Sequence, residues 1–332
     1  QVHMQELGVD LLLVTPSADL RYLIGYNAIP LERLTALVIA PHAEPFLIVP
    51  KLEVSTAKAS PFGGLGWKVI GWSESENPYE LIGSRSGFTH GRIAVDNHMW
   101  AERVLTITEK FPESNIELAA PIINAIRVVK TPAELDHLRV AAAAIDRVHA
   151  QVPNLLRVGR TEEEVGRDIA DLILAEGHTR VDFVIVASGP NGASPHHELS
   201  SRVIQMGDPV VVDIGGTMPS GYCSDCTRTY SMGDPGGDYL ERYAALQVAQ
   251  ELSTQAVSHG AISHDIDAAG RNSLAEHGLN EYFIHRTGHG IGLETHEEPY
   301  IGENNSTVIE NNMVFSIEPG FYIEGVHGAR IE

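Results

Sequence analysis

Carboxylates at the ends of apolar strands constrain this chain more than any other feature. Asp213 directly follows the apolar run Val210–Val212, and Glu318 directly follows Met313–Ile317. A charge in a protein interior must be paired with an opposite charge or bound to a metal ion, because leaving it unpaired is costly. These two positions therefore predict either buried ion pairs or a cation site.

A third carboxylate lies inside a predicted strand. Asp225 is near the middle of Cys223–Tyr230, twelve residues after Asp213, and the turn Pro219–Gly221 separates the two positions. A hairpin with this spacing brings both side chains onto one face of a sheet. We therefore expect Asp213 and Asp225 to lie side by side.

The last five residues, Gly328–Glu332, supply a fourth carboxylate. The two-residue alternation of a strand places Arg330 and Glu332 on one face, opposite the apolar side chains. An ion pair or a helix cap explains any one of these acids about as well as a metal does. Four such acids together favour bound cations, because they would otherwise repel one another.

Histidines beside glycine and proline turns are further candidate ligands. His285 and His289 have the spacing of a zinc-binding helix, but the glutamate of that motif is missing and glycines break the helix. A glycine-rich loop that presents His289 is the better prediction. His296 follows seven residues later, and His196 and His197 lie in a loop before the Val210 strand. Most of the sixteen histidines are expected to be structural.

The two cysteines, Cys223 and Cys226, exclude a disulfide framework and fit a reducing cytoplasm. Their C-x-x-C spacing is also found in redox and zinc sites. Here the pair lies in a predicted strand and lacks nearby soft ligands, so neither chemistry is predicted.

Charge and hydropathy exclude two classes of partner. The formal net charge of −21 repels a phosphate backbone, so nucleic-acid binding is not expected. The apolar runs are too short to span a bilayer, and no secretion leader opens the chain, so a cytoplasmic protein is expected.

The order of predicted elements indicates two domains, as does the length of 332 residues. Short apolar strands alternate with helical segments in residues 1–126, which favours a smaller α/β domain. Residues 127–332 favour an α+β domain that begins with two capping boxes. Predicted helices cover 131–152, 161–177, 238–260 and 263–277, and predicted strands cover 11–14, 36–40, 46–49, 92–95, 183–187, 210–214, 223–230, 313–317 and 328–332.

The whole pattern resembles the pita-bread metallopeptidases, the family of methionine aminopeptidase, aminopeptidase P and prolidase. The first 126 residues resemble, more weakly, the creatinase-like domain that prolidase and aminopeptidase P carry. This favours the proline-specific branch, closest to bacterial Xaa-Pro dipeptidases. The local phrases that carry the resemblance occur in family order: Val212–Gly216, Ser224–Thr229, Thr287–Gly292, Ile317–Gly320 and Gly328–Glu332.

The resemblance implies two divalent metal ions held by Asp213, Asp225, His289, Glu318 and Glu332. Asp213 would chelate one ion, Asp225 and Glu332 would bridge both, and the other two residues would complete one ion's shell. The oxygen-rich set favours Mn²⁺, with Co²⁺, Zn²⁺ or Fe²⁺ as alternatives.

The same resemblance implies roles in catalysis. Glu318 would shuttle a proton, His196 would hydrogen-bond the scissile amide, and His296 would stabilise the developing oxyanion. His285 and Arg330 would position the substrate, although Arg330 alternatively neutralises nearby carboxylates.

The implied activity is hydrolysis of the Xaa-Pro bond in dipeptides by a homodimer. The alternatives are an Xaa-Pro aminopeptidase acting on longer peptides and, from another class, a metal-free creatinase-like hydrolase or an inactive binding module. Compared with the family pattern the chain begins inside a first helix and stops at Glu332, so a shortened chain is expected.

Overall fold

The computed structural model describes residues 1–332 and divides them into two compact units, Gln1–Arg127 and Val128–Glu332. Each unit buries hydrophobic clusters of its own. No helix has both the length and the apolar character needed to cross a membrane.

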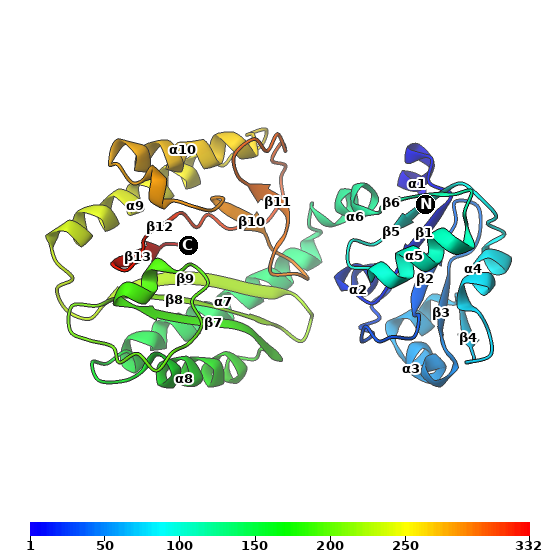
Figure 1. The fold of residues 1–332 in the computed structure, drawn as a ribbon, viewed down its shortest axis with the longest axis horizontal. Helices are drawn as coiled ribbons and strands as arrows, with labels where there is room; N and C mark the ends of the chain where they lie inside the picture. Colours follow the sequence, from blue (N-terminus) through cyan, green and yellow to red (C-terminus); the bar gives the residue numbers. More distant parts are fainter. The chain divides into compact units, whose positions relative to one another are not determined.

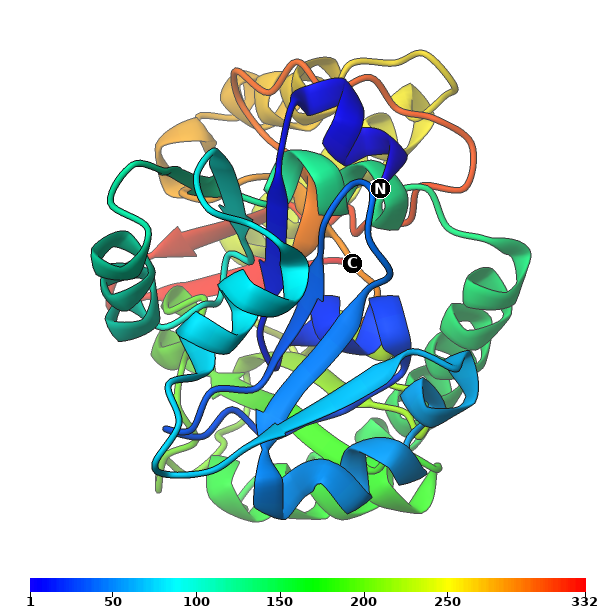
Figure 2. The same ribbon diagram turned by 90° about the vertical axis from the view of Figure 1, so that its right-hand side faces the viewer.

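The N-terminal unit is built on a six-stranded mixed sheet (Figures 1 and 2), in the order β4-β3-β2-β1-β5-β6. The central strand β1 runs antiparallel to β2 and parallel to β5. The four apolar strands predicted here are confirmed. The strands are β1 (Leu11–Val14), β2 (Ala36–Ile39), β3 (Phe46–Pro50), β4 (Lys68–Trp72), β5 (Arg92–Val95) and β6 (Asn115–Leu118).

Helices cover both faces of this sheet. Leu11 and Leu13 pack in the cluster that contains Ile82 of α4, whereas Leu12 and Val14 belong to the opposite cluster with Leu20 of α2. The edge strands β4 and β6 were not predicted, because their side chains are mostly half-buried or exposed and form no apolar run. The helices are α1 (Val2–Leu7), α2 (Ala18–Ile24), α3 (Val54–Ala59), α4 (Pro78–Ser86), α5 (Ala101–Lys110) and α6 (Ala120–Arg127).

The C-terminal unit begins with two capped helices and a three-stranded antiparallel sheet (Figure 1). Both predicted capping boxes are present, at Thr131 and Thr161. Val212 and Ile214 pack against the two helices, so the alternation of the strand turns Asp213 to the other face. The elements are α7 (Pro132–Leu155), α8 (Glu162–Ala175), β7 (Arg180–Ser188), β8 (Pro209–Thr217) and β9 (Cys223–Ser231).

The rest of this unit consists of two helices and two short hairpins. Figure 1 shows β13 and the C-terminus (red) next to β9, on the side of the sheet away from α8. Hydrogen bonds between Thr229 and Arg330 join the two segments. The elements are α9 (Gly237–Ala256), α10 (Ser263–Glu276), β10 (Gly288–Gly290), β11 (Glu297–Ile301), β12 (Gly320–Ile323) and β13 (His327–Arg330).

Two local predictions are wrong. The segment Met313–Ile317 is not a regular strand, and the predicted glycine loop contains the short strand β10. The two segments do lie together, with backbone bonds from Ile291 to Val314 and from Ser316 to His289. Between them only an isolated bridge forms, from Gly290 to Phe315.

His149 of α7 gives the C-terminal unit a pH-dependent stability. Its ring lies 2.9 Å from the carbonyl oxygen of Cys226 and 3.0 Å from the hydroxyl of Tyr230. Burial lowers the pKa of His149 from 6.5 to about 4. The unfolded chain therefore binds a proton between these two pH values that the folded chain excludes.

We expect the free energy of unfolding to fall by about 2 kcal/mol more in the wild type than in a His149→Gln variant when the pH is lowered from 7 to 5. Urea unfolding followed by circular dichroism measures this difference. All three tryptophans lie in the N-terminal unit, so their fluorescence reports that unit separately. An equal loss in the two proteins would contradict the assignment.

Candidate metal centre

Two long strands carry the first acidic side chains of the centre. In the β8–β9 register Asp213 faces Thr227, and Gly215 faces Asp225. Asp213 and Asp225 therefore share one face at diagonal positions, where long side chains can meet. One carboxylate oxygen from each of Asp213, Asp225 and Glu332 lies within 4.8 Å of the others.

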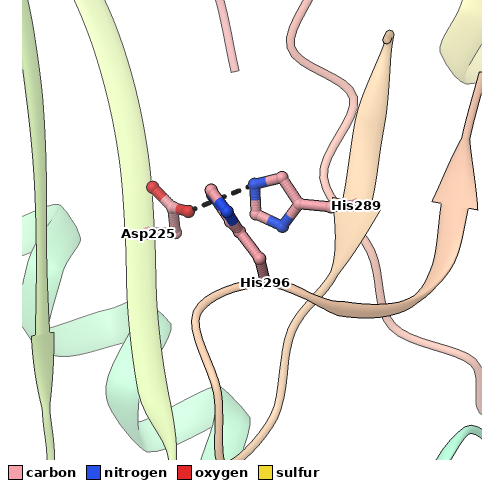
Figure 3. Close-up of side chains that lie close together, drawn as sticks. All are labelled: Asp225, His289 and His296. Atoms are coloured by element: carbon pink, nitrogen blue, oxygen red, sulfur yellow. Dashed lines mark ion pairs between the residues drawn. The ribbon is translucent and has the colours of Figure 1, made fainter. Parts of the chain in front are cut away.

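A second group of ligand atoms includes two histidines (Figure 3). Asp225, His289 and His296 each place one atom within 4.8 Å of the others. Nε2 of His289 lies 3.5 Å from Oδ2 of Asp225, and the two imidazole centroids are 3.9 Å apart. His296, which the sequence suggested only as an oxyanion donor, thus lies at ligand distance. Asp225 belongs to both groups.

Glu318 reaches the centre through His289. Its Oε1 lies 2.9 Å from Nε2 of His289, although Glu318 is in neither group of clustered atoms. Ser316 fixes both residues, since its hydroxyl donates to Glu318 at 2.9 Å and accepts from the backbone N–H of His289 at 3.1 Å. Ser316 therefore orients two predicted ligands at once.

Arg330 lies inside the acidic cluster and is almost fully buried. Its guanidinium donates to Asp213, to Thr227 Oγ1 at 3.1 Å and to the Tyr322 hydroxyl at 2.8 Å. It also lies 3.8 Å from Glu318. These contacts match the alternative in which Arg330 neutralises carboxylates, and its substrate role stays a prediction.

One guanidinium does not compensate four carboxylates. Burial, and then the charges of neighbouring acids, raise the pKa of Asp225 and of Glu332 well above their usual values. Burial also raises the pKa of Asp213, even though Arg330 opposes the shift. Burial would raise the pKa of Glu318 too, but the hydrogen bond and charge of His289 lower it to about 2.

These residues fit divalent cations. Asp213 Oδ1 and Glu332 Oε2 are buried and accept no hydrogen bond, although buried carboxylate oxygens are normally satisfied. Clustered carboxylates whose pKa values are raised by burial and by mutual repulsion gain stability from a cation between them. Carboxylate oxygens with one or two imidazoles suit Mn²⁺ and related ions better than soft-metal chemistry.

His285 contacts the centre only indirectly. Its Nδ1 lies 2.7 Å from the carbonyl oxygen of Arg286, and its Nε2 lies 2.9 Å from the Tyr322 hydroxyl, which in turn accepts from Arg330. Burial lowers the pKa of His285 and raises that of Tyr322 to about 12. A neutral imidazole can accept from Tyr322 and donate to the carbonyl. The three side chains form a hydrogen-bonded chain that ends at Asp213.

The loop that carries His196 is held by a buried glutamate. Glu162, at the start of α8, accepts hydrogen bonds from Ser188, Asn191 and Ser200, and its Oε2 lies 2.8 Å from Nε2 of His197. Burial would raise the pKa of Glu162, but these hydrogen bonds lower it. His197 is thereby a structural residue, whereas His196 is exposed and close enough to His296 to affect its pKa.

Sequence reasoning missed most residues that orient the ligands. Thr227 and Ser316 lie two positions from predicted ligands, so strand alternation could have indicated them. Glu162 gave no signal, because an acid in the first turn of a helix is ordinarily exposed. Asp267 of α10, which is fully buried and bonds the Thr287 backbone N–H and hydroxyl, likewise gave none.

The two cysteines take no part in the centre. Both are free and buried in β9. Burial raises the pKa of both thiols, that of Cys226 to about 12, so they stay protonated at neutral pH.

Comparison with known proteins identifies the architecture. The profile of metallopeptidase family M24 matches residues 136–332, and that of the creatinase/prolidase N-terminal domain matches residues 1–129. The resemblance stated from the motifs is confirmed. The expected fold is confirmed too: a pita-bread catalytic domain preceded by a creatinase-like domain.

Similar proteins match nearly the whole chain. A Xaa-Pro dipeptidase of Lactobacillus delbrueckii is 36% identical over 99% of this chain and 90% of its own length. The crystal structure of dipeptidase PepE from Mycobacterium ulcerans has a TM-score of 0.95 and 48% identity, covering 99% of this chain and 88% of the other. A prolidase from Thermococcus sibiricus has a TM-score of 0.92 and 36% identity, covering 99% and 90%.

Replacing Glu162 by Gln should destabilise the His196 loop. The amide would turn an N–H group toward donors that now converge on a carboxylate, which costs about 2–4 kcal/mol of unfolding free energy. Urea unfolding and the rate of proteolysis within residues 189–200 measure the effect. Glu163→Gln, at the exposed neighbouring position, is the control. Equal behaviour of the two variants would remove the role given to Glu162.

Proposed function

The chain belongs to metallopeptidase family M24, and from this premise we propose that it hydrolyses the Xaa-Pro bond of dipeptides. It is a metal-dependent peptidase that binds divalent ions. The observation that carries the proposal is the cluster of Asp213, Asp225 and Glu332 beside His289, in a chain similar to a Xaa-Pro dipeptidase along almost its whole length.

We propose that two ions bind in this centre and that Mn²⁺ is the preferred metal. Asp213, Asp225 and Glu332 supply oxygens, and His289 and Glu318 complete the set. His296 lies close enough to be a further ligand in one state of the centre. When bound, the ions supply Lewis-acid activation of a water molecule and of the scissile carbonyl.

Side chains of the protein then bind the peptide and accept the proton that the attacking water loses. Glu318, with a pKa of about 2, is ionised at neutral pH and can accept the proton of the attacking water at its carboxylate. Burial and the neighbouring His289 lower the pKa of His296 to about 4, so its neutral ring can donate one N–H bond to the developing oxyanion. His196 donates to the scissile amide from the loop held by Glu162.

The chemistry of the leaving group fits this arrangement. Proline leaves as a secondary amine, and its nitrogen must gain a proton as the C–N bond breaks. Glu318 can deliver the proton that it took from water, so a single carboxylate serves both halves of the reaction.

We also propose a cytoplasmic homodimer. Two free, buried cysteines suit a reducing compartment. The dimer follows from the family resemblance, and light scattering of the purified protein tests it.

Metal and substrate are tested together. With added Mn²⁺ the protein should hydrolyse Xaa-Pro dipeptides faster than Xaa-Pro-Yaa tripeptides, and a chelator should abolish both rates.

Asp225→Asn should lose most bound metal in elemental analysis, because Asp225 belongs to both ligand groups. The exposed Asp136→Asn variant should keep its metal. Less than one ion per chain with chelator-resistant activity would refute the peptidase proposal.

Glu318→Ala tests the proton shuttle. We expect kcat to fall by about 10²–10⁴-fold or more, because a positioned acid–base group contributes rate enhancement of that order. Circular dichroism should show an intact fold, and metal content should be measured in the same sample. The exposed Glu324→Ala variant, six residues away, is the matched control. Near-normal turnover would remove this role from Glu318.

A further inference from the structure

The position of the His296 ring depends mainly on the backbone that carries it. The side chain is exposed and makes no hydrogen bond or ion pair, and its one ring contact is with His289, at 3.9 Å between centroids. A group that acts in catalysis has to be held closely in its productive geometry. Because His296 lacks a hydrogen bond of its own, the turn before β11 has to supply that restraint.

This turn is folded around the carboxylate of the next residue, Glu297, which is buried. Oε2 of Glu297 accepts the backbone N–H of Glu294 at 3.4 Å. A Cβ atom on Gly292 would lie 2.5 Å from Oε1 of the same carboxylate, so a larger residue there would displace it. The place of the Glu297 carboxylate therefore sets the path of residues 292–297.

A buried ion pair holds that carboxylate. Nζ of Lys130 lies 2.6 Å from Oε1 of Glu297, and the two side chains are 1% and 8% exposed. Lys130 is itself fixed, because its backbone N–H donates to the carbonyl oxygen of Asn312 at 2.9 Å. The capping box at Thr131, which begins the 24-residue helix α7, follows it directly. The pair thus ties the turn of His296 to the start of a long helix.

Stability alone does not explain a buried pair of this kind. Removing two charges from water is costly, and apolar residues of the same size often join two segments as well or better. An ammonium group before a helix also opposes the helix dipole. A charge-assisted hydrogen bond gives direction, which apolar contact does not. Pulled by Lys130 on one oxygen and by the Glu294 N–H on the other, the carboxylate of Glu297 has a single position.

We propose that the Lys130–Glu297 pair positions His296 for catalysis; this rests on the oxyanion role proposed for His296 in peptide hydrolysis. Neither member of the pair touches the reacting atoms. Without the pair the fold remains, but the ring of His296 loses its fixed place beside His289. A hydrogen bond that forms only in the transition state is then weakened, which lowers kcat and leaves KM and metal content unchanged.

The double variant Lys130→Met/Glu297→Gln tests the pair, because it removes both charges and leaves neither buried alone. Its kcat for a Xaa-Pro dipeptide should fall by about 10–100-fold, the usual cost of losing a residue that orients another. KM and the metal content should stay at wild-type values. The matched control, Lys110→Met/Glu80→Gln, makes the same two substitutions in an exposed ion pair and should keep the wild-type kcat.

Glu297→Asp is a second variant that keeps both charges, so the fold is not at risk from an unpaired ion. Its side chain is one methylene shorter, and the turn must shift to keep the bond to Lys130. We again expect a lower kcat at unchanged KM.

The coupling with His296 distinguishes positioning from general support of the fold. In a His296→Ala background the ring is absent, so neutralising the pair should change kcat by less than about twofold. A pair that supported the whole centre would instead cost the same factor with and without His296.

Hydrogen–deuterium exchange gives a readout that needs no turnover. In the double variant the backbone amides of 292–297 should exchange faster than in the wild type, because the carboxylate that binds the Glu294 N–H is gone. The amides of 210–216 should exchange at the wild-type rate. Unchanged exchange at 292–297 would show that the pair does not hold the turn.

The outcomes separate this inference from the function on which it rests. A wild-type kcat in both the double variant and Glu297→Asp, or an equal loss in the His296→Ala background, refutes the role of the pair and leaves the peptidase proposal standing. If the wild type hydrolyses no Xaa-Pro peptide with any divalent metal, the proposed function fails and this inference fails with it.

Discussion

The rest of the C-terminal unit depends on the crowding of carboxylates between β8, β9 and the segment after β13. Asp213, Asp225 and Glu332 lie within ligand distance of one another; Asp213 is buried and the other two are half-buried. Their repulsion is only partly offset by Arg330. Arg330 is held beside the acids by the hydrogen bonds that its guanidinium donates to the hydroxyl oxygens of Thr227 and Tyr322.

Several hydrogen bonds around the centre come from residues that orient the predicted ligands but are not ligands themselves. Ser316 orients both Glu318 and His289, and Asp267 holds the backbone of Thr287 just before the ligand strand. Glu162 does the same for the loop of His196. Such partners raise the precision of a metal site because they lock the rotamers of its ligands. The centre is thus assembled by buried polar residues that need not touch metal or substrate.

The sequence predicts those parts of the fold and of the site whose signal lies in neighbouring residues. The ligands stood out because carboxylates interrupt apolar runs, and the helices stood out because their caps are local motifs. The supporting residues did not, since Glu162 and Asp267 are buried by segments distant in sequence. The strand predicted at Met313–Ile317 failed because strand formation depends on a distant partner. Its apolar residues pack in a core cluster, but the segment makes only one isolated bridge, to Gly290 of the three-residue strand β10.

The strands that carry the ligands of the centre differ in how firmly their backbones are held. Asp213 and Asp225 come from nine-residue strands joined by a continuous ladder, whereas His289 comes from a three-residue strand with an irregular register. Local opening is easiest where few ladder bonds must break. Backbone amides of 288–290 should therefore exchange with solvent deuterium sooner than those of 210–216. A local opening that admits a peptide would then move His289 and leave Asp213 and Asp225 in place.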